Sequence, residues 1–296
     1  LGKTEITLVI GAESMTNAPY LLPKARMGYR MNQGNIEDSM IHDGLYDRLV
    51  PGHMGMTAEN IAVKYNITRE QCDKHALLSH QRATRALNEG RFKREIVPVP
   101  LKTRKGIVNF EVDEHPITDA SLEAMGALKP AFKEGGVVTA ANASGINDAA
   151  AGAIFMTKKK ARELGLKPLM RLINICGEGV DPKVMGLGPA VAIPKALKQA
   201  GMKFDDIDYW EINEAFASQF LGCKIMLKED FGIDLDLEKC NINGSGISLG
   251  HPVGCTALRI CVSLYYEMER SGHTVGGASV CVGGGPAMAS LWTRDI

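Results

Sequence analysis

Residues 243–254 read N-G-S-G-I-S-L-G-H-P-V-G, and residues 280–285 read V-C-V-G-G-G. Each stretch places one chemically reactive side chain, His251 or Cys281, among glycines. Because glycine has no Cβ, a substrate can come close to the backbone at such positions. The two stretches together suggest a Cys/His active site for acyl chemistry.

The residues around these stretches predict one helix and two strands. A helix is expected over 252–270, closed by Gly272. Apolar runs at 278–282 and 287–293 predict strands that pair across a Gly-Gly-Gly-Pro turn. This end of the chain therefore predicts part of a sheet with a long helix beside it.

Upstream of this region, strands and helices alternate from about residue 147. Strands are expected at 149–156, 169–175 and 207–212, and helices after Thr157, over 189–200 with Gly201 behind it, and over 214–228. This alternation predicts an α/β layer with helices on both faces. The last two strands would make the sheet mixed.

The first half of the chain predicts a less regular insertion. A buried strand is expected over 5–10, then a long excursion over 15–50. Two helices should follow, one capped by Thr57 and starting at Ala58, and one with a Thr68/Gln71 capping box that stops at Gly90. Short strands are expected at 96–99 and 106–112, with irregular structure over 113–139.

Composition limits the function classes. The chain of 296 residues is long enough for two domains, and its 45% apolar and 23% charged residues are ordinary for a soluble protein. Lys plus Arg equals Asp plus Glu at 34 each, which argues against a general attraction to nucleic acid or a membrane surface. Seven cysteines without a C-x-x-C pair indicate free thiols, a cytosolic location and no zinc site. No metal is expected.

His251 precedes Pro252, which suits the first turn of the next helix. A helix N-terminus favours neutral imidazole, which can act as a base toward a thiol or help to bind an oxyanion. The alternative is a core histidine that caps a loop. The glycines around it weigh against that alternative, because they clear space around the ring.

Cys281 ends an apolar strand and meets three glycines. With a lowered pKa its thiol could be a nucleophile or an acid/base group, and the alternative is a buried structural cysteine. The backbone N–H groups of Gly283–Gly285 could form an oxyanion hole or simply a tight hairpin. Among the other cysteines, Cys255 is the nearest rival for a chemical role.

Three further segments are candidates for substrate contacts. Asn213 could hold a water against a reacting carbonyl, or act as a helix N-cap. The small and polar segment 138–145 could let a thin ligand arm lie along the backbone, with Ser144 offering a hydroxyl. His53-Met54-Gly55 could line a pocket, and a plain loop or turn is the alternative for both segments.

These motifs together resemble the thiolase family, of the acetyl-CoA acetyltransferase type, over essentially the whole of residues 1–296. The motifs are G-A-E-S-M-T at 11–16, H-M-G-M-T-A-E-N at 53–60, N-A-S-G-I-N-D at 142–148, V-D-P-K-V-M-G-L-G-P at 180–189, N-E-A-F-A at 213–217, G-H-P-V-G at 250–254 and C-V-G-G-G at 281–285. Each motif is weak alone, and the combination is highly specific.

The resemblance implies a Claisen condensation of two acetyl-CoA molecules to acetoacetyl-CoA and CoA, or the reverse thiolysis, through an acyl-cysteine. His251 would activate the nucleophilic cysteine and, with a water held by Asn213, bind one thioester oxygen. Cys281 would remove a proton from the second acetyl-CoA, and the Gly283 N–H would form part of a second oxyanion hole.

The resemblance also implies how coenzyme A, the fold and the assembly are arranged. The expected coenzyme A contacts are His53, Met54, Met125, Leu128, Ala131, Phe132, Ala140, Ser144, Gly145, Ala215 and Phe216. An arginine common in related enzymes near Ile117, which meets the adenine, is absent here. The thioesters are substrates, and no cofactor is expected. Residues 22–40 match a tetramer contact loop, so a homotetramer or dimer of dimers is expected, with no nucleic-acid or membrane partner.

The implied fold is a layered α/β arrangement of mixed sheets between helices, with an inserted loop domain. Residues 1–14 and 146–168 would belong to an N-terminal half-domain, 15–145 to the loop domain and 169–296 to the C-terminal half-domain. In the family the nucleophilic cysteine lies before the position of Leu1, so the N-terminal half-domain is expected to be incomplete here.

Three alternatives stay open. One is a truncated or split, non-catalytic thiolase-like subunit that binds CoA or a partner. A second is a degradative 3-ketoacyl-CoA thiolase of broader chain length, because Gly254-Cys-Thr resembles that group whereas His53-Met54 resembles the short-chain enzymes. A ketoacyl synthase is disfavoured, since that group has a histidine where Cys281 stands.

Overall fold

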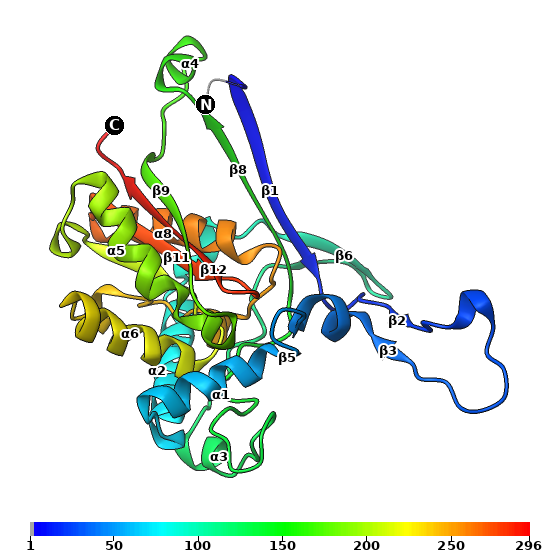
Figure 1. Cartoon of the computed structure of the whole chain (residues 1–296). Coiled ribbons are helices and arrows are strands. Elements are labelled where there is room, and N and C mark those ends of the chain that lie inside the picture. Colours follow the sequence, from blue (N-terminus) through cyan, green and yellow to red (C-terminus); the bar gives the residue numbers. More distant parts are fainter. Residues whose placement is uncertain (1–2) are drawn as a thin grey trace.

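A four-stranded mixed sheet forms the centre of the second half of the chain in the computed structural model, which describes residues 3–296 (Figure 1). The strand order is β10-β11-β12-β9, and β10 and β11 are parallel whereas β12 is antiparallel to both of its neighbours. The strands are β9 (Arg171–Gly179), β10 (Tyr209–Ile212), β11 (Val275–Cys281) and β12 (Pro286–Thr293). The predicted mixed sheet and the hairpin at its end are confirmed.

Helices cover both faces of this sheet because side chains of successive strand residues alternate between the faces. On one face α5 (Gly188–Ala200) packs through Ile193 against Leu291. On the other face α8 (Thr256–Ser271) packs through Leu264 against Trp292. The alternation within β12 therefore produces two separate apolar cores, one on each face of the sheet.

A second pair of strands runs antiparallel beside the sheet domain (Figure 1). β1 (Ile6–Ser14) pairs with β8 (Asp148–Met156), with Ile6 opposite Met156. Several of its apolar side chains are exposed, among them Ile10 and Ile154. The predicted strand at 149–156 is confirmed, and β1 runs four residues beyond the predicted 5–10. The expected burial of that strand is wrong, because its residues from Ile6 to Ile10 are exposed. Leu1 and Gly2, which the predicted remnant 1–14 includes, lie outside the described residues.

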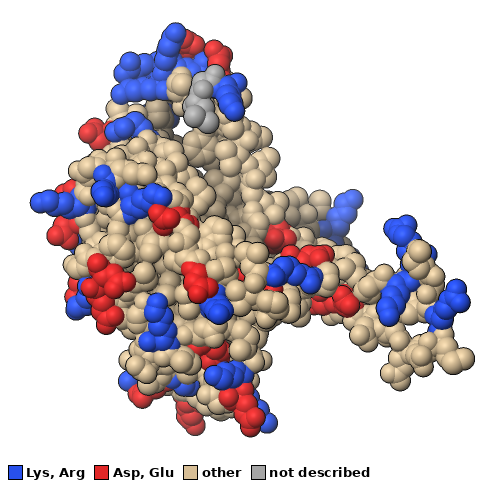
Figure 2. All heavy atoms as spheres, viewed as in Figure 1, with Lys and Arg blue, Asp and Glu red and all other residues tan. Residues whose placement is uncertain are grey.

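The excursion predicted over 15–50 is present and continues to residue 53. It extends away from the body and contains only short elements (Figure 1). These are β2 (Tyr20–Leu21), a turn of 3-10 helix (Ala25–Met27), β3 (Glu37–Asp38), a π-helical turn (Met40–Leu45), β4 (Tyr46–Asp47) and β5 (Gly52–His53). On the face shown in Figure 2, acidic and basic side chains are mixed over the body. The tip of the excursion carries basic ones there.

Three helices pack together beneath the sheet: α1 (Met54–Tyr65), α2 (Arg69–Asn88) and α6 (Ala217–Phe231). The Thr68/Gln71 capping box of α2 is confirmed. The predicted Thr57 cap is wrong, since His53 Nδ1 accepts from the Gly55 N–H at 3.0 Å and caps a helix that starts at Met54. The Thr57 hydroxyl instead donates back to the Met54 carbonyl at 2.7 Å.

Two predicted helix starts are also wrong, and both matter for the site. The helix expected from residue 214 begins at Ala217, so Asn213 is not its N-cap. The helix expected from Pro252 begins at Thr256, after a turn in which the Cys255 N–H donates to the Pro252 carbonyl at 2.8 Å. In both places tertiary contacts hold residues of the functional motifs outside the helix.

The helices expected after Thr157 and over 189–200 lie close to their predicted positions. The strand expected over 96–99 is displaced to 99–103, and the short helices at 122–126 and 246–249 were not predicted. α4 (Lys158–Glu163) is capped by Thr157 as expected, and Gly201 closes α5 in the left-handed conformation. The other short elements are β6 (Val99–Thr103), β7 (Gly106–Phe110), α3 (Leu122–Gly126) and α7 (Gly246–Leu249). Among residues 3–296, no helix combines the length and apolar character that crossing a membrane requires.

Candidate active site

Cys281 lies at the end of β11, with its side chain 5% exposed. It belongs to an apolar cluster that joins the sheet to the start of α1 and to the segment before α6. The buried members are Met54, Ala58, Val138, Met185, Ala215, Phe216 and Cys281, with Phe132, Val137 and Ala143 packed against them. The structure thus brings four of the predicted coenzyme A contacts to Cys281, namely Met54, Phe132, Ala215 and Phe216.

The Cys281 thiol is protonated in this surrounding at neutral pH. Burial raises the pKa of Cys281 to about 12, because an apolar environment penalises the thiolate. From the sequence, a nucleophilic or acid/base role for Cys281 is conditional on a lowered pKa, and the ligand-free protein raises this pKa instead. Cys281 is held as a proton donor, and it becomes a base only after giving up its proton.

Most backbone N–H groups of the turn after Cys281 donate hydrogen bonds within the protein. Val282 and Gly285 make the hydrogen bonds of the hairpin turn. The Gly284 N–H donates to Asp47 Oδ2 at 2.9 Å. Within residues 3–296, the Gly283 N–H is the amide of this turn that has no acceptor. The predicted nest of three glycines therefore offers one free donor, at Gly283, which packs against Met54.

His251 is partly buried, and a neighbouring hydroxyl group orients its ring. Its Nδ1 lies 2.7 Å from the Thr256 hydroxyl. Asn147 fills the space beside Gly250, where a Cβ would come within 2.1 Å of the amide. Burial and then the charge of Arg259 lower the pKa of His251 to about 4, so the imidazole is neutral at pH 7. The neutral ring was predicted, but its cause is burial and Arg259 rather than an adjacent helix N-terminus.

Asn213 follows β10 and is fully buried. Its backbone N–H donates to the Ser279 carbonyl of β11 at 3.0 Å, which places it beside the strand that ends at Cys281. Within residues 3–296, neither atom of its side-chain amide has a hydrogen-bond partner. Buried polar atoms are rarely left unpaired, so this amide can bind a water or a ligand oxygen.

The segments that carry Asn213 and Cys281 meet at one edge of the sheet, and the glycine-rich segment that leads to His251 packs against Asn213. The parallel strands β10 and β11 end at Ile212 and Cys281, and ligands of α/β sheets bind beyond such carboxyl ends. The loop before His251 packs on the Asn213 side chain, since a Cβ on Gly246 would lie 2.8 Å from Asn213 Oδ1. A neutral imidazole, an unpaired amide, a free backbone N–H and a thiol at one edge suit acyl chemistry.

Comparison with known protein families agrees with this geometry. Residues 1–159 match the model of the thiolase N-terminal domain, and residues 166–294 match that of the thiolase C-terminal domain. The chain belongs to the thiolase family.

Similar thiolases are known over nearly the whole chain. A solved acetyl-CoA acetyltransferase from Syntrophomonas wolfei is 68% identical with a TM-score of 0.97, covering 99% of this chain and 74% of that one. A curated acetyl-CoA acetyltransferase of Syntrophomonas wolfei is 49% identical, covering 98% of this chain and 72% of the relative. The beta-ketothiolase BktB of Cupriavidus necator is 47% identical, covering 99% and 73%. The thiolase-like α/β fold expected from the sequence is thereby confirmed.

The other predicted coenzyme A contacts of this thiolase differ in how deeply they are buried. His53 stacks on Phe132 with ring centroids 4.6 Å apart, and burial lowers the pKa of His53. The Ser144 N–H donates to the Ala215 carbonyl at 2.9 Å, so these two segments lie side by side. Ala131, Ala140 and Leu128 are exposed, and Gly145 packs on the His115 ring.

Met125 differs from this group. Its side chain is 3% exposed and packs in the core formed by α1, α2 and α6 rather than in the Cys281 cluster. Ile117, near which an arginine is absent, is exposed, and its N–H donates to His80 Nδ1 at 3.1 Å. Only part of the predicted coenzyme A set therefore lines the Cys281 end of the site.

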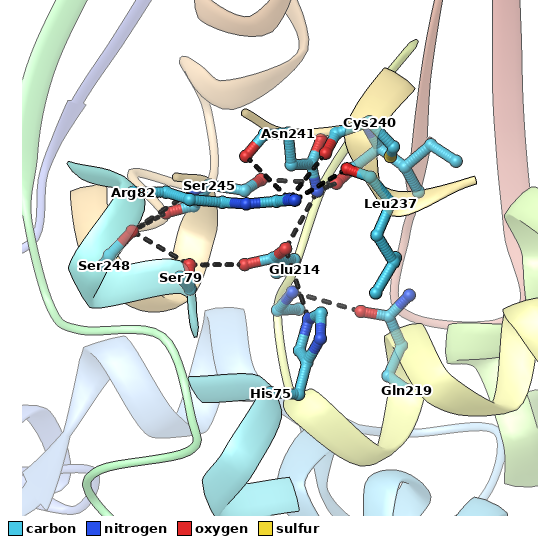
Figure 3. Close-up of polar contacts among 12 residues, drawn as sticks. His75, Ser79, Arg82, Glu214, Gln219, Leu237, Cys240, Asn241, Ser245 and Ser248 are labelled. Atoms are coloured by element: carbon cyan, nitrogen blue, oxygen red, sulfur yellow. Dashed lines mark hydrogen bonds and ion pairs between the residues drawn. The ribbon is translucent and has the colours of Figure 1, made fainter. Parts of the chain in front are cut away.

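Sequence reasoning missed a buried polar network around Glu214, the neighbour of Asn213 (Figure 3). Ser79 donates to Glu214 Oε2 at 2.7 Å, Asn241 donates to Glu214 Oε1 at 2.9 Å, and His75 Nε2 lies 3.2 Å from that oxygen. Burial opposes the Glu214 charge, but His75 and the hydrogen bonds outweigh it and lower the pKa of Glu214. The network fixes the segment that carries Asn213.

A signal for this network is present in α2. His75, Ser79 and Arg82 recur at spacings of four and three residues, so they share one face of the helix. Arg82 donates to the backbone carbonyls of Leu237 and Cys240 at 2.7 and 2.8 Å. A polar stripe on a helix face that must pack inward indicates partners elsewhere in the chain.

Glu59 of α1 was also missed. Its carboxylate accepts from the Val137 N–H at 3.0 Å and the Val138 N–H at 2.9 Å. These amides begin the small and polar segment that was predicted to lie along a ligand arm. Glu59 thereby fixes that segment beside the Cys281 cluster.

Proposed function

We propose that the protein is an acetyl-CoA C-acetyltransferase that condenses two acetyl-CoA molecules to acetoacetyl-CoA and CoA, and catalyses the reverse thiolysis. The observation that supports this most is the arrangement of Asn213, His251 and the Cys281–Gly283 turn at one edge of the sheet in a member of the thiolase family. Coenzyme A thioesters are the substrates in this proposal, and the chemistry needs no cofactor.

In the first half-reaction the neutral His251 takes the proton of a nucleophilic cysteine thiol. The resulting thiolate attacks the thioester carbonyl, and the water held by Asn213 together with the His251 N–H stabilises the oxyanion. The bond from the carbonyl carbon to the CoA sulfur breaks. The Cys281 thiol protonates the leaving CoA thiolate. Its raised pKa keeps the proton on the thiol until this step and makes the resulting Cys281 thiolate a stronger base.

In the second half-reaction the Cys281 thiolate removes a proton from the methyl carbon of a second acetyl-CoA. The Gly283 N–H stabilises the enolate oxygen. The enolate carbon attacks the acetyl-cysteine, so that a carbon–carbon bond forms and the bond to the cysteine sulfur breaks. The nucleophile leaves as a thiolate beside protonated His251, and Cys281 is again a thiol.

Short acyl chains fit this site better than long ones. The apolar cluster around Cys281 is filled by bulky side chains, notably Met54, Met185 and Phe216. A broader 3-ketoacyl-CoA thiolase is the alternative, and Gly254-Cys-Thr supports it. Thiolysis rates with acetoacetyl-CoA and with six- and eight-carbon 3-ketoacyl-CoA distinguish the two, because the proposal expects a steep fall with length.

The proposal includes a homotetramer and a cytosolic location. The excursion exposes Leu22, Met27, Met31 and Ile36, with Met31 91% exposed, which suits a contact between copies. All seven cysteines are free, as is usual in a reducing compartment. Light scattering of wild type and of a Met27→Ser/Met31→Ser variant tests the assembly: the variant should form smaller species.

The central experiment mixes the full-length protein with acetyl-CoA and measures its intact mass. An acetyl adduct on a cysteine is expected within one turnover, and His251→Ala should lose it. Cys261→Ala serves as a control, because Cys261 lies on α8 and its sulfur contacts the Ser290 hydroxyl. Coenzyme A binding without any adduct in wild type would favour the non-catalytic alternative instead.

A further inference from the structure

The hydroxyl of Thr256 lies between the active-site histidine and the backbone. Its Oγ1 is 2.7 Å from His251 Nδ1 and 2.9 Å from the Pro252 carbonyl oxygen, to which it donates. The side chain is fully buried at the first residue of α8. Both distances fit strong hydrogen bonds.

A threonine hydroxyl has one proton and accepts with its lone pairs. Since Thr256 gives that proton to the Pro252 carbonyl, it faces His251 as an acceptor. The proton of the neutral imidazole then resides on Nδ1, and the lone pair resides on Nε2. The hydrogen bond between Nδ1 and Thr256 opposes a ring flip that would exchange the two nitrogens.

We propose that Thr256 is a positioning residue that fixes the Nδ1–H tautomer of His251, so that Nε2 serves as the base toward the nucleophilic thiol. The proposal rests on the function proposed above. It explains how one nitrogen serves two roles in order. Nε2 first takes the thiol proton and then, as N–H, donates to the thioester oxyanion, while Nδ1 stays bound to Thr256.

Two substitutions separate the hydrogen bond from the packing. Thr256→Val keeps the shape of the side chain and removes the hydroxyl, whereas Thr256→Ser keeps the hydroxyl. Thr256→Val should slow cysteine acetylation by about 10- to 100-fold, by analogy with the loss of a hydrogen-bond partner that orients a metal-binding histidine. Thr256→Ser should stay within about threefold of wild type. Thr293→Val, a buried threonine of β12, is the matched control.

A spectroscopic measurement tests the tautomer without any reaction. In the full-length protein with 15N-labelled histidine, the His251 signals are identified by their loss in His251→Gln. At pH 7.5 wild type and Thr256→Ser should show Nδ1 protonated and Nε2 unprotonated. Thr256→Val should show both nitrogens as a mixture of the two forms.

The outcomes separate the two proposals. Wild type with its proton on Nε2 overturns the role of Thr256 even if the enzyme is active, and so does a Thr256→Val variant that acetylates at the wild-type rate. If His251→Ala also acetylates normally, the proposed function of His251 fails. The 15N measurement would then still show whether Thr256 fixes the tautomer of His251.

Discussion

Asp47 holds the turn that follows Cys281, although 237 positions separate it from its partner. Its Oδ2 accepts from the Gly284 N–H at 2.9 Å, and its Oδ1 accepts from the Leu49 N–H at 2.7 Å. The side chain is 5% exposed. The last residues of the excursion are therefore tied to the loop that presents the free Gly283 amide.

Asp47→Ala should lower the condensation rate by about 10- to 100-fold, because a small displacement of an oxyanion donor is costly. In the proposed mechanism, acetylation of the cysteine depends on the other oxyanion site, so its rate should change less. Comparing single-turnover acetylation with steady-state condensation gives the split. Asp43→Ala, an exposed carboxylate of the same segment, is the control. Equal losses in both steps would argue that Asp47 acts only on stability.

Glu214→Ala should destabilise the fold by about 3–5 kcal/mol, because it leaves His75, Ser79 and Asn241 without their buried partner. Glu214→Gln keeps an acceptor and should cost less. The measurement is the free energy of unfolding in urea. Glu238→Gln is the control, since this side chain is 86% exposed where it meets Arg82, and it should change stability by less than about 0.5 kcal/mol. A loss below 1 kcal/mol for Glu214→Ala would speak against the network.

His251 should make the fold less stable in acid. Its folded pKa of about 4 lies below its ordinary value of 6.5, so the folded state favours neutral imidazole. Its stabilising contribution is present above pH 6.5 and is lost as the pH falls toward 4. Linkage gives a loss of about 2 kcal/mol between pH 7.5 and pH 5.

The test compares wild type with His251→Gln, because other groups titrate in the same range. Burial raises the pKa values of Glu95 and Glu211 to about 7, and these carboxyls stabilise the fold as the pH falls. The variant keeps both carboxyls and lacks the histidine. Its unfolding free energy should therefore fall less than that of wild type from pH 7.5 to pH 5. Parallel curves would refute the histidine contribution.

Cys281 should resist alkylation in the ligand-free protein. Burial raises its pKa from 9.0 to about 12, so almost no thiolate exists at pH 8. Iodoacetamide should leave Cys281 unmodified in the folded protein over a time in which the same cysteine reacts fully in an unfolded control. Peptide mapping measures the modification in both samples. Fast modification of Cys281 at pH 8 would show that its thiolate is available without substrate.

Local signals in the sequence predicted much of the fold. The Thr68 capping box, the Thr157 cap and Gly201 each act within a few residues, and each lies where it was expected. The helix starts at Ala217 and Thr256 were missed because their limits are set by contacts with distant segments. One such contact is the hydrogen bond that the Ala217 N–H donates to the Asn142 carbonyl.

The site shows the same division. His251 and Cys281 could be proposed as site residues because glycines mark their surroundings and their motifs resemble a known family. Asp47 and Glu214 act through partners more than 100 positions away, so single-sequence patterns do not show their contacts. The raised pKa of Cys281 was missed for a related reason, since burial by Met54 and Phe216 comes from other parts of the chain.

We propose that His251 activates the nucleophilic cysteine and that Cys281 acts in carbon–carbon bond formation. Cys281→Ala in the full-length protein tests this assignment most directly. After mixing with acetyl-CoA, intact mass should show the acetyl-cysteine, while acetoacetyl-CoA formation falls below detection. A variant that forms acetoacetyl-CoA at the wild-type rate would contradict the account, because the carbon–carbon bond would then form without the Cys281 thiolate.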